Sequence, residues 1–413
     1  MNKNARQIAF EALYKIFYND AYSNIAIDSA LVDINKSKGF ITRLVYGVVE
    51  RKLTLDYLIN MYCNKPKPKV FIILRMGVYQ LYFMDKVSSA AAIDESVKLA
   101  KSVGLDFYSK LINAVLHKID NNRINIDEID DPEIRYSIPA SLINVWKKAY
   151  GEDAVYSFLP CLNEKAPIFA VPNTIFVDKD ELQFEFSCED VESETVGDLV
   201  TVVSNLDIRN SKAYKNGLFH IEDLSCYNAV KALNPQEGDV VIDVCSAPGG
   251  KAFTCAEMMN NIGKIYACDI SEHRVKLIKN GADRLELSSV TPMVNDATVY
   301  NNNLPMADKI ICDVVCSGFG IIRRKPEIRY KNLDSIKNLP EIQYNILDTS
   351  AQYLKNGGKI LYSTCTLNKR ENERVVEKFI VNHTEYKIIE MKTIFPSQNG
   401  GDGFFYSVLK GTK

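Results

Sequence analysis

The sequence has no long hydrophobic run and no sign of a secretory leader. A membrane-spanning helix needs about 20 consecutive apolar residues, whereas the runs Val70–Leu74 and Val78–Met84 are short and interrupted. The first ten residues enter an amphipathic helical pattern without an apolar signal core. We therefore expect a cytoplasmic protein that does not interact with a membrane.

The chain also lacks a metal-binding pattern. None of its ten cysteines forms a Cys-x-x-Cys pair, and its four histidines are scattered, at His117, His220, His273 and His383. Zinc sites normally show closely spaced ligands of these two types. We expect reduced thiols, most of them packed as small apolar side chains, and no metal.

There is little excess charge of either sign. The formal net charge of −2 argues against a protein that coats nucleic acid non-specifically. Residues 1–130 nevertheless carry 18 Lys and Arg against 14 Asp and Glu. This small basic excess favours, weakly, a binding appendage on an enzyme.

The length of 413 residues predicts a multidomain protein with about three domains. Residues 1–130 carry apolar residues at helical spacing, interrupted at Pro66 and Pro68, which predicts an all-α bundle. Residues 131–230 predict a small α+β module. The bundle is expected to contain helices at Phe71–Met84, Ser88–Ala100 and Phe107–Ile119, and the module a helix at Ala140–Tyr150 with strands at Ile168–Val171, Leu182–Phe186, Leu199–Val203 and Leu218–Ile221.

Residues 231–413 alternate between β-branched runs and helical patterns. Such alternation is typical of a doubly wound, mostly parallel, Rossmann-like α/β sheet. The expected strands are Asp239–Cys245, Lys264–Ile270, Val290–Asn295, Lys309–Val315 and Lys359–Thr364, and the clearest helices are Glu341–Leu354 and Glu371–Val381. The tail, Gly403–Leu409, fits a final edge strand, parallel or antiparallel.

Several chemically active residues stand where these strands end. They are Cys245, Asp269, Asp296, Asp313, Cys316 and Cys365. A single acid at a strand end is more often a helix cap. Ligands of open α/β sheets bind beyond the carboxyl ends of the strands, so we expect these six residues to meet at one rim.

A glycine-containing loop, Cys245–Lys251, follows the first of these strands. Glycines let a backbone approach a ligand, and the following helix N-terminus favours its polar part. The loop is neither a phosphate-binding P-loop nor Gly-x-Gly-x-x-Gly, which disfavours ATP and NAD. Asp269 is placed to accept from the ribose hydroxyls of a nucleoside, and Asp296 from an adenine amino group.

Two of the cysteines have polar neighbours. Cys365 lies between Thr364 and Thr366, and Cys316 precedes Ser317, whereas Cys312 is predicted to pack into the sheet. A thiol needs such a setting to act as a thiolate nucleophile. The pattern suggests attack by sulfur on an aromatic base followed by one-carbon transfer, but spacing does not rank the two thiols.

Three motifs together resemble the RNA (cytosine-5)-methyltransferases of the Sun type. They are Asp-x-Cys-Ser-Ala-Pro-Gly-Gly-Lys from Asp243, Asp-x-x-Cys-Ser-Gly from Asp313 and Tyr-Ser-Thr-Cys-Thr from Tyr362. The segments Val70–Tyr82, Ala92–Val97 and Asn113–Leu116 are similar to the NusB-like helical domain found in the branch of this family that acts on small-subunit ribosomal RNA. Ile322–Tyr330 and Gly401–Phe405 look like further elements of that branch.

The resemblance implies roles for individual residues. Cys365 matches the nucleophile that adds to carbon 6 of cytosine, and Cys316 matches a second cysteine that helps to release the product. Asp313 matches a residue that also bonds the ring. S-adenosylmethionine is implied as the cofactor, bound by Cys245, Ser246, Ala247, Pro248, Gly249, Gly250, Lys251, Asp269, Asp296 and Asp313.

The plainest departure from the family pattern lies immediately before the second cysteine, and a less serious one is Glu222-Asp223, where the family often has Gln-Asp. Val315 stands where the family usually has a proline immediately before the second cysteine. Proline would fix φ and orient that cysteine in advance. Valine is stiff and compatible with a strand, so the thiol can still be placed correctly. The efficiency of product release is left open.

Basic residues follow the Cys316 loop. Arg323, Arg324, Lys325 and Arg329 are predicted to contact RNA phosphates, with a solvated loop as the alternative. The expected partner is 16S ribosomal RNA, and the chain is expected to act as a monomer.

Two other functions stay open at this point. Transfer RNA is a substrate for the same chemistry, and a non-catalytic assembly factor would keep the fold, although retention of both cysteines argues against it. Methylation of an adenine amino group is disfavoured because Asp313–Cys316 lacks a Pro-Pro-aromatic element.

Overall fold

The computed structural model describes residues 4–19, 21–32, 37–203, 206–208, 210–398 and 400–412. The chain divides into two compact units. The first comprises Met1–Asn163 and Ile322–Lys331, and the second comprises Glu164–Ile321 and Asn332–Lys413. The three-domain division at residues 130 and 230 stays a prediction, and the helix at Ala140–Tyr150 groups with the first unit.

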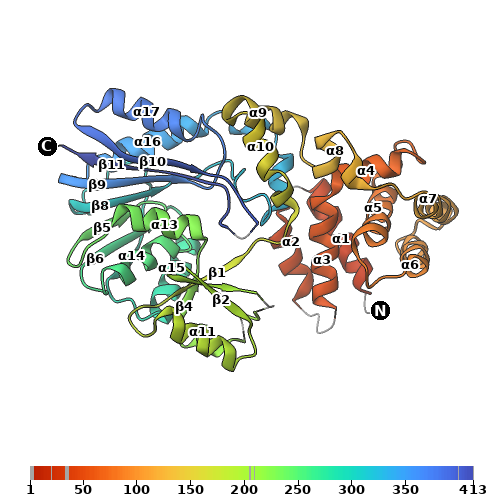
Figure 1. The fold of residues 1–413 in the computed structure, drawn as a ribbon, viewed down its shortest axis with the longest axis horizontal. Helices are drawn as coiled ribbons and strands as arrows, with labels where there is room; N and C mark the ends of the chain where they lie inside the picture. Colours follow the sequence, from red (N-terminus) through yellow and green to blue (C-terminus); the bar gives the residue numbers. More distant parts are fainter. Residues whose placement is uncertain are drawn as a thin grey trace. The chain divides into compact units, whose positions relative to one another are not determined.

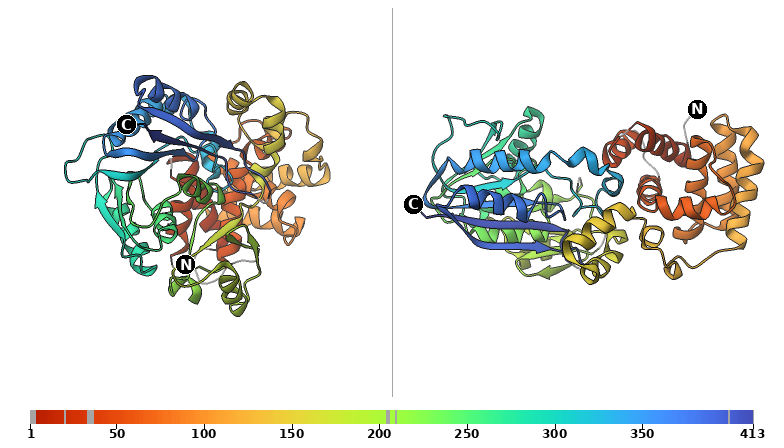
Figure 2. Two further views of the ribbon diagram at one scale, coloured as in Figure 1. Left: turned by 60° about the vertical axis from the view of Figure 1, so that its left-hand side comes forward. Right: turned by 90° about the horizontal axis from the view of Figure 1, so that it is seen from above.

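The described part of the first unit is helical, as predicted. The strands of Figure 2 all belong to the yellow-green to blue part of the chain. Among the described residues no helix combines the length and apolarity needed to cross a membrane. The helices of the unit are α1 (Ala5–Tyr18), α2 (Ser23–Leu31), α3 (Lys38–Glu50), α4 (Lys52–Asn60), α5 (Pro68–Phe83), α6 (Ser89–Ser102), α7 (Ser109–Asn121), α8 (Pro132–Tyr136), α9 (Ala140–Tyr150) and α10 (Glu152–Phe158), with 3₁₀ turns η1 (Asp106–Tyr108), η2 (Ile126–Glu128), η3 (Pro160–Asn163) and η4 (Pro326–Tyr330).

Helix α5 is the centre of this bundle (Figure 1). Every residue from Ile72 to Leu81 is buried, and most of them are apolar, as expected for a helix enclosed on all sides. A Cβ atom at Gly77 would lie 2.7 Å from the side chain of Leu116 on α7. Glycine at this position therefore allows α5 and α7 to pack closely.

The second unit contains a small antiparallel sheet with strand order β2-β3-β1-β4. Its strands are β1 (Ile168–Pro172), β2 (Ser193–Val196), β3 (Leu199–Val202) and β4 (Phe219–Ile221), with helices α11 (Lys179–Cys188) and α12 (Lys212–Lys215).

The predicted strand at Leu182–Phe186 is wrong, because this segment lies within α11. Leu182 and Phe186 are buried four residues apart on one helix face, whereas Phe184 is 66% exposed. The apolar residues at alternate positions therefore matched the pattern of a strand, although the segment is helical. A capping box begins the helix: the Asp178 carboxylate accepts from the Glu181 N–H, and the Glu181 carboxylate accepts from the Asp178 N–H.

The large sheet has seven strands in the order β10-β11-β9-β8-β5-β6-β7. The five strands from β9 to β7 in this order are parallel. The strand order reverses between β5 and β8, which is where open α/β sheets bind ligands. The strands are β5 (Val240–Asp243), β6 (Lys264–Asp269), β7 (Val290–Val294), β8 (Ala307–Asp313), β9 (Leu354–Thr364), β10 (Tyr386–Ile394) and β11 (Phe404–Gly411).

Helices cover both faces of this sheet, as a doubly wound fold requires. Figure 1 shows α13 and α14 on one face and α16 and α17 on the other, and a separate apolar core fills each side. The helices are α13 (Leu224–Leu233), α14 (Gly250–Met258), α15 (Glu272–Arg284), α16 (Leu339–Ala351) and α17 (Glu373–Asn382), with the 3₁₀ turn η5 (Leu333–Ile336).

The tail is an antiparallel strand but not the edge strand that the sequence predicted. β11 lies between β9 and β10, so β10 forms the edge. Six consecutive residues of β10, Lys387–Lys392, are exposed. Because the strand buries no regular apolar face, it leaves no alternating signal in the sequence.

A buried cluster of charged groups joins β4 to α14. The Nδ1 atom of His220 lies 3.2 Å from the Glu257 carboxylate, and its Nε2 atom lies 3.3 Å from the Thr254 hydroxyl. Thr254 donates to the Glu222 carboxylate at 2.6 Å. Burial lowers the pKa of His220, but the carboxylates of Glu257 and Glu222 outweigh it and raise that pKa to about 9.

This cluster predicts a loss of stability at alkaline pH. The His220 contribution is complete below its ordinary pKa of 6.5 and is lost as the pH rises through about 9. One extra proton in the folded state corresponds to about 1.4 kcal/mol per pH unit. Between pH 7 and 9 the thermal midpoint should fall more steeply in the parent than in His220→Gln. His117→Gln, on the exposed surface of α7, is the control. Equal slopes in all three proteins would contradict the assignment.

Candidate active site

The glycine loop connects β5 to α14 and is a fixed turn. The Ser246 N–H donates to the Cys268 carbonyl at 2.7 Å, and the Gly249 N–H donates to the Ser246 carbonyl at 2.7 Å. Gly249 has a φ of +118°, and a Cβ atom there would lie 2.4 Å from the Phe253 ring. Glycine is therefore required, and the turn presents its backbone at the N-terminus of α14.

The side chains of this loop differ in their surroundings. Pro248 is exposed, whereas Ser246 and Ala247 are buried. Cys245 packs against the core shared with α16 and α17, and burial raises the pKa of its thiol well above the usual value. Cys245 therefore contributes packing and loop shape, not a nucleophile.

Asp243 ends β5, two residues before the loop begins, and was not singled out from the sequence. It is buried, and within the described residues neither of its carboxylate oxygens nor the Ser246 hydroxyl has a hydrogen-bond partner of good geometry. Burial raises the pKa of Asp243 to about 7, against smaller opposing effects of Ser246 and Lys251. Unpaired polar atoms beside a glycine turn fit a site that receives the polar part of a cofactor.

Asp269 ends β6 as predicted, but a basic residue already contacts it. Its carboxylate lies 3.0 Å from Nη1 of Arg274 and accepts from the Ser271 N–H at 3.0 Å. The Nη2 atom of Arg274 donates to the Ala247 carbonyl at 2.7 Å. Arg274, which the sequence analysis missed, thus ties the acid to the glycine loop.

Asp296 follows β7 and is exposed. Its carboxylate accepts from the backbone and the hydroxyl of Thr298, and these hydrogen bonds lower its pKa. This arrangement is a local turn. A role in binding an adenine amino group stays a prediction.

Asp313 ends β8 and is held from two sides. The Lys251 ammonium lies 2.8 Å from one carboxylate oxygen, and the Ser363 hydroxyl donates to the other at 2.8 Å. Burial lowers the pKa of Lys251, but the Asp313 carboxylate outweighs it, so that the pKa is raised well above its usual value. Lys251 therefore stays charged and neutralises Asp313.

The two cysteines meet at the same rim. Their Sγ atoms are 3.2 Å apart although 49 residues separate them in the sequence. They meet because Asp313 pairs with Ser363 in the parallel β8–β9 register, and each cysteine follows shortly afterwards. Both are partly exposed, whereas Cys312 is buried in the sheet core as predicted.

The described contacts of Cys316 favour its protonated form. The hydrogen bond with Cys365 raises the pKa of Cys316 well above its usual value, and burial and the charges of Cys365, Glu371 and Asp313 act in the same direction. Cys316 therefore keeps its proton at neutral pH. A protonated Cys316 can donate to the sulfur of Cys365.

Arg329 does not lie where an RNA phosphate could reach it, so this part of the RNA-binding prediction is corrected. Its side chain is 1% exposed and inside the first unit. The guanidinium donates to the carbonyls of Glu50 and Leu162 and to the Asn163 side chain, at 2.7, 3.2 and 3.0 Å. Spacing to the Cys316 loop could not reveal this burial.

The other three basic residues belong to the same segment of the first unit. Arg323 and Arg324 are partly exposed and Lys325 is exposed. Their predicted contact with RNA stays a prediction.

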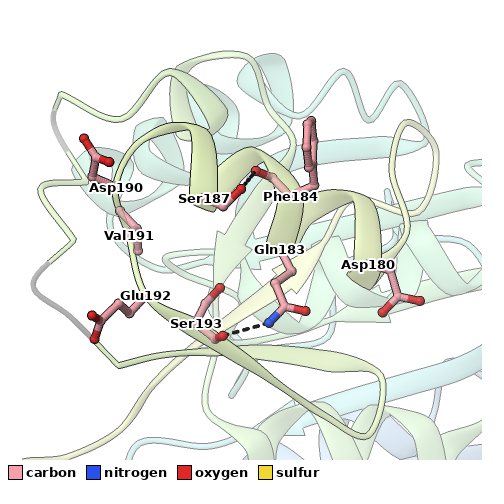
Figure 3. A pocket seen from close by; sticks show the side chains of 8 residues that line it. All are labelled: Asp180, Gln183, Phe184, Ser187, Asp190, Val191, Glu192 and Ser193. Carbon is pink, nitrogen blue, oxygen red and sulfur yellow. Dashed lines mark hydrogen bonds between the residues drawn. The ribbon is translucent and has the colours of Figure 1, made fainter.

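A hollow on the small module contains none of the predicted site residues (Figure 3). It is lined by Asp180, Gln183, Phe184, Ser187, Asp190, Val191, Glu192 and Ser193, and Gln183 spans it by donating to the Ser193 carbonyl at 2.7 Å. In the part of the chain that the structure describes, no group of three or more His, Cys, Asp or Glu side chains is arranged to hold a metal ion.

Comparison with known families places two profiles on the chain. The family described as 16S rRNA methyltransferase RsmB/F matches residues 230–410, and the NusB family matches residues 3–121. The first contains both cysteines and the glycine loop. The second corresponds to the helical bundle.

Curated relatives are similar over their full length. The chain is 36% identical over 443 residues to a probable ribosomal RNA small subunit methyltransferase B of Bacillus subtilis, with 98% of both chains covered. It is 30% identical over 448 residues to the corresponding probable enzyme of Synechocystis, covering 98% of this chain and 99% of that one.

Two solved structures have a similar fold. The crystal structure of PH0851 superposes with a TM-score of 0.79 at 26% identity, covering 99% of both chains. NSun6 from Pyrococcus horikoshii with SFG gives a TM-score of 0.59 at 20% identity, covering 67% of this chain and 98% of that chain. At that identity the second likeness concerns the fold alone.

The site geometry predicts that Asp269 supports binding of S-adenosylmethionine, the cofactor that the sequence resemblance implied. Asp269→Ala removes a buried acceptor and should weaken cofactor binding in calorimetry by roughly 10- to 100-fold, or about 1–3 kcal/mol. Asp283→Ala, on the exposed side of α15, is the control. Equal affinity of Asp269→Ala and the parent would remove Asp269 from the site. An equal loss in Arg274→Ala would show that the acid acts through the loop.

Proposed function

Because the chain belongs to the RsmB/F family of 16S rRNA methyltransferases, we propose that Cys365 is the nucleophile with which it methylates carbon 5 of a cytosine. The enzyme depends on S-adenosylmethionine, and its substrate is 16S ribosomal RNA. The observation that carries the assignment is the 3.2 Å contact between the thiols of Cys316 and Cys365 at the end of β8 and β9.

Cys365 activates the base by forming and later breaking one carbon–sulfur bond. The target base must first leave its stack, at a cost of a few kcal/mol. The thiolate then adds to carbon 6, which makes carbon 5 nucleophilic. S-adenosylmethionine, when bound, supplies the methyl group from its sulfonium. After carbon 5 has accepted the methyl group and lost its proton to a base, the carbon–sulfur bond breaks and Cys365 leaves as a thiolate.

The surrounding groups support this order of events. A proton held on Cys316 stabilises a thiolate on Cys365 through the contact between them. The Asp313 carboxylate accepts from Lys251 and Ser363 and retains lone pairs for the amino group of the cytosine. Asp313 would thereby orient the ring. Cys316 would assist release.

The RNA itself is proposed to be held by basic side chains outside the sheet. Lys325, with Arg323 and Arg324, is assigned to phosphate contacts that position the substrate without reading its sequence. We further propose that the enzyme acts as a monomer in the cytoplasm. Deleting the helical unit would not test these roles cleanly, because the deletion removes the Glu50 carbonyl to which Arg329 is bound.

The two cysteines should give opposite results when each is replaced. Cys365→Ala should abolish methyl transfer and form no RNA–protein adduct, because carbon 5 is never activated. Cys316→Ala should still attack and methylate, and then accumulate a covalent complex that survives denaturing gel electrophoresis. Cys188→Ala is the control, because Cys188 is exposed and distant in sequence from the other two cysteines.

Reversed behaviour of the two variants would exchange their roles. Full activity of both would exclude the thiol mechanism. Val315→Pro addresses the departure from the family pattern: if valine slows release in the parent, this variant should shorten the life of the adduct.

Variants in the basic segment should show which residues bind RNA and which stabilise the fold. Lys325→Gln should raise the RNA concentration needed for activity and reduce the slope of log K against log salt by about 0.7, with unchanged cofactor affinity. Arg329→Gln should instead lower the thermal midpoint, because it leaves buried carbonyls unpaired. Lys276→Gln, exposed on α15, is the control. An unchanged salt slope in Lys325→Gln would rule out its phosphate contact.

A further inference from the structure

A buried carboxylate that the reaction does not use lies behind the two cysteines. Glu371 is fully buried, and its carboxylate accepts four hydrogen bonds. The donors are the Ser317 N–H at 2.8 Å, the Ser317 hydroxyl at 2.5 Å, the Gln343 amide at 3.0 Å and the Asn368 amide at 2.7 Å. A carboxylate offers only acceptor oxygens, so it can satisfy all four donors.

These hydrogen bonds fix both neighbours of Cys316. Ser317, directly after Cys316, gives both its N–H and its hydroxyl to Glu371. Gln343, which also donates to Glu371, donates to the carbonyl of Val315, directly before Cys316. The cysteine is therefore held on both sides by groups that converge on one carboxylate.

The same network reaches both neighbours of Cys365. The Thr366 hydroxyl lies 2.7 Å from the Ser317 hydroxyl and accepts from the Phe319 N–H at 3.1 Å. The Thr364 hydroxyl donates to Asn372, the residue after Glu371, at 2.6 Å. Donation thus runs in one direction, from Phe319 through Thr366 and Ser317 to Glu371.

We propose that Glu371 is a positioning residue that holds the Cys316 loop against the Cys365 loop, so that Cys316 can assist release of the methylated base from Cys365. This inference rests on the proposed roles of the two thiols and goes beyond them. Glu371 is fully buried, and it acts through Ser317 and Gln343.

Charge gives the carboxylate a second effect. The groups that face Cys316 are Cys365, Glu371 and Asp313, and Asp313 is neutralised by Lys251. The Glu371 charge helps to raise the pKa of Cys316. Removing that charge while keeping the shape of the side chain therefore lowers the pKa of one catalytic thiol without removing it.

The test is Glu371→Gln, which keeps the volume and removes the charge. Single-turnover methyl transfer should stay within a few-fold of the parent. Release should slow by at least tenfold, so that the covalent RNA adduct accumulates on denaturing gels as in Cys316→Ala. The rate of release should depend on pH through the titration of Cys316. The midpoint of that dependence should move to lower pH by about one unit, a shift typical of one nearby charge.

Two further variants make the test decisive. Glu373→Gln changes the same residue type two positions later, where the carboxylate accepts from Thr393 on β10 at 3.0 Å; it should release product like the parent. If Glu371→Gln does not fold, Ser317→Ala removes one donor from the carboxylate and should give a smaller accumulation of adduct.

Release and pH profile equal to those of Glu373→Gln would overturn the role of Glu371. A loss of thermal stability with an unmoved pH profile would reduce it to a structural residue. If Cys316→Ala itself forms no adduct while the parent methylates, the proposed roles of the cysteines fail first, and the two failures are distinguishable.

Discussion

The parallel pairing of β8 with β9 is the constraint on which the site depends. It sets Asp313 opposite Ser363, so the chain leaves both strands at the same level. Cys316 and Cys365 then meet at 3.2 Å although no local interaction connects them. A slip of one residue in this register would turn every side chain of one strand to the opposite face. The register of the sheet therefore determines whether the two thiols come together.

Charge at the rim is balanced pair by pair. Lys251 neutralises Asp313, and Arg274 neutralises Asp269 while it holds the Ala247 carbonyl. Within the described residues the oxygens of Asp243 have no such partner, and burial raises its pKa to about 7. The paired acids are the ones proposed to orient the cofactor and the base. The unpaired acid is the one whose protonation responds near neutral pH.

The basic residues of the segment Ile322–Lys331 have two kinds of surroundings that the sequence alone could not separate. The segment begins six residues after Cys316 and belongs to the helical unit, where the Tyr330 hydroxyl donates to the Val49 carbonyl at 2.9 Å. Its basic residues therefore divide by burial. Arg329 stabilises the helical unit, and Lys325 is left at the surface. The chain thereby connects the helical unit directly to the cysteine loop.

Local signals in the sequence determined most of the fold and the chemistry. Apolar periodicity predicted the helices of the bundle and the parallel strands, and the strand-end positions of Asp269, Asp313, Cys316 and Cys365 predicted one rim, because parallel strands end at a common edge. Apolar periodicity gave a wrong or missing prediction where the burial of side chains did not follow it. The apolar residues of α11 alternate as they would in a strand, and β10 buries no regular face. Glu371 was expected only as the first residue of a helix, where an acid is ordinary. Its contacts with Ser317 and Gln343, 54 and 28 residues away, depend on how distant loops pack. The sequence by itself thus determined the family and the residues proposed to carry the reaction, and tertiary structure decided which groups hold them in place, because those contacts join segments that share no local pattern.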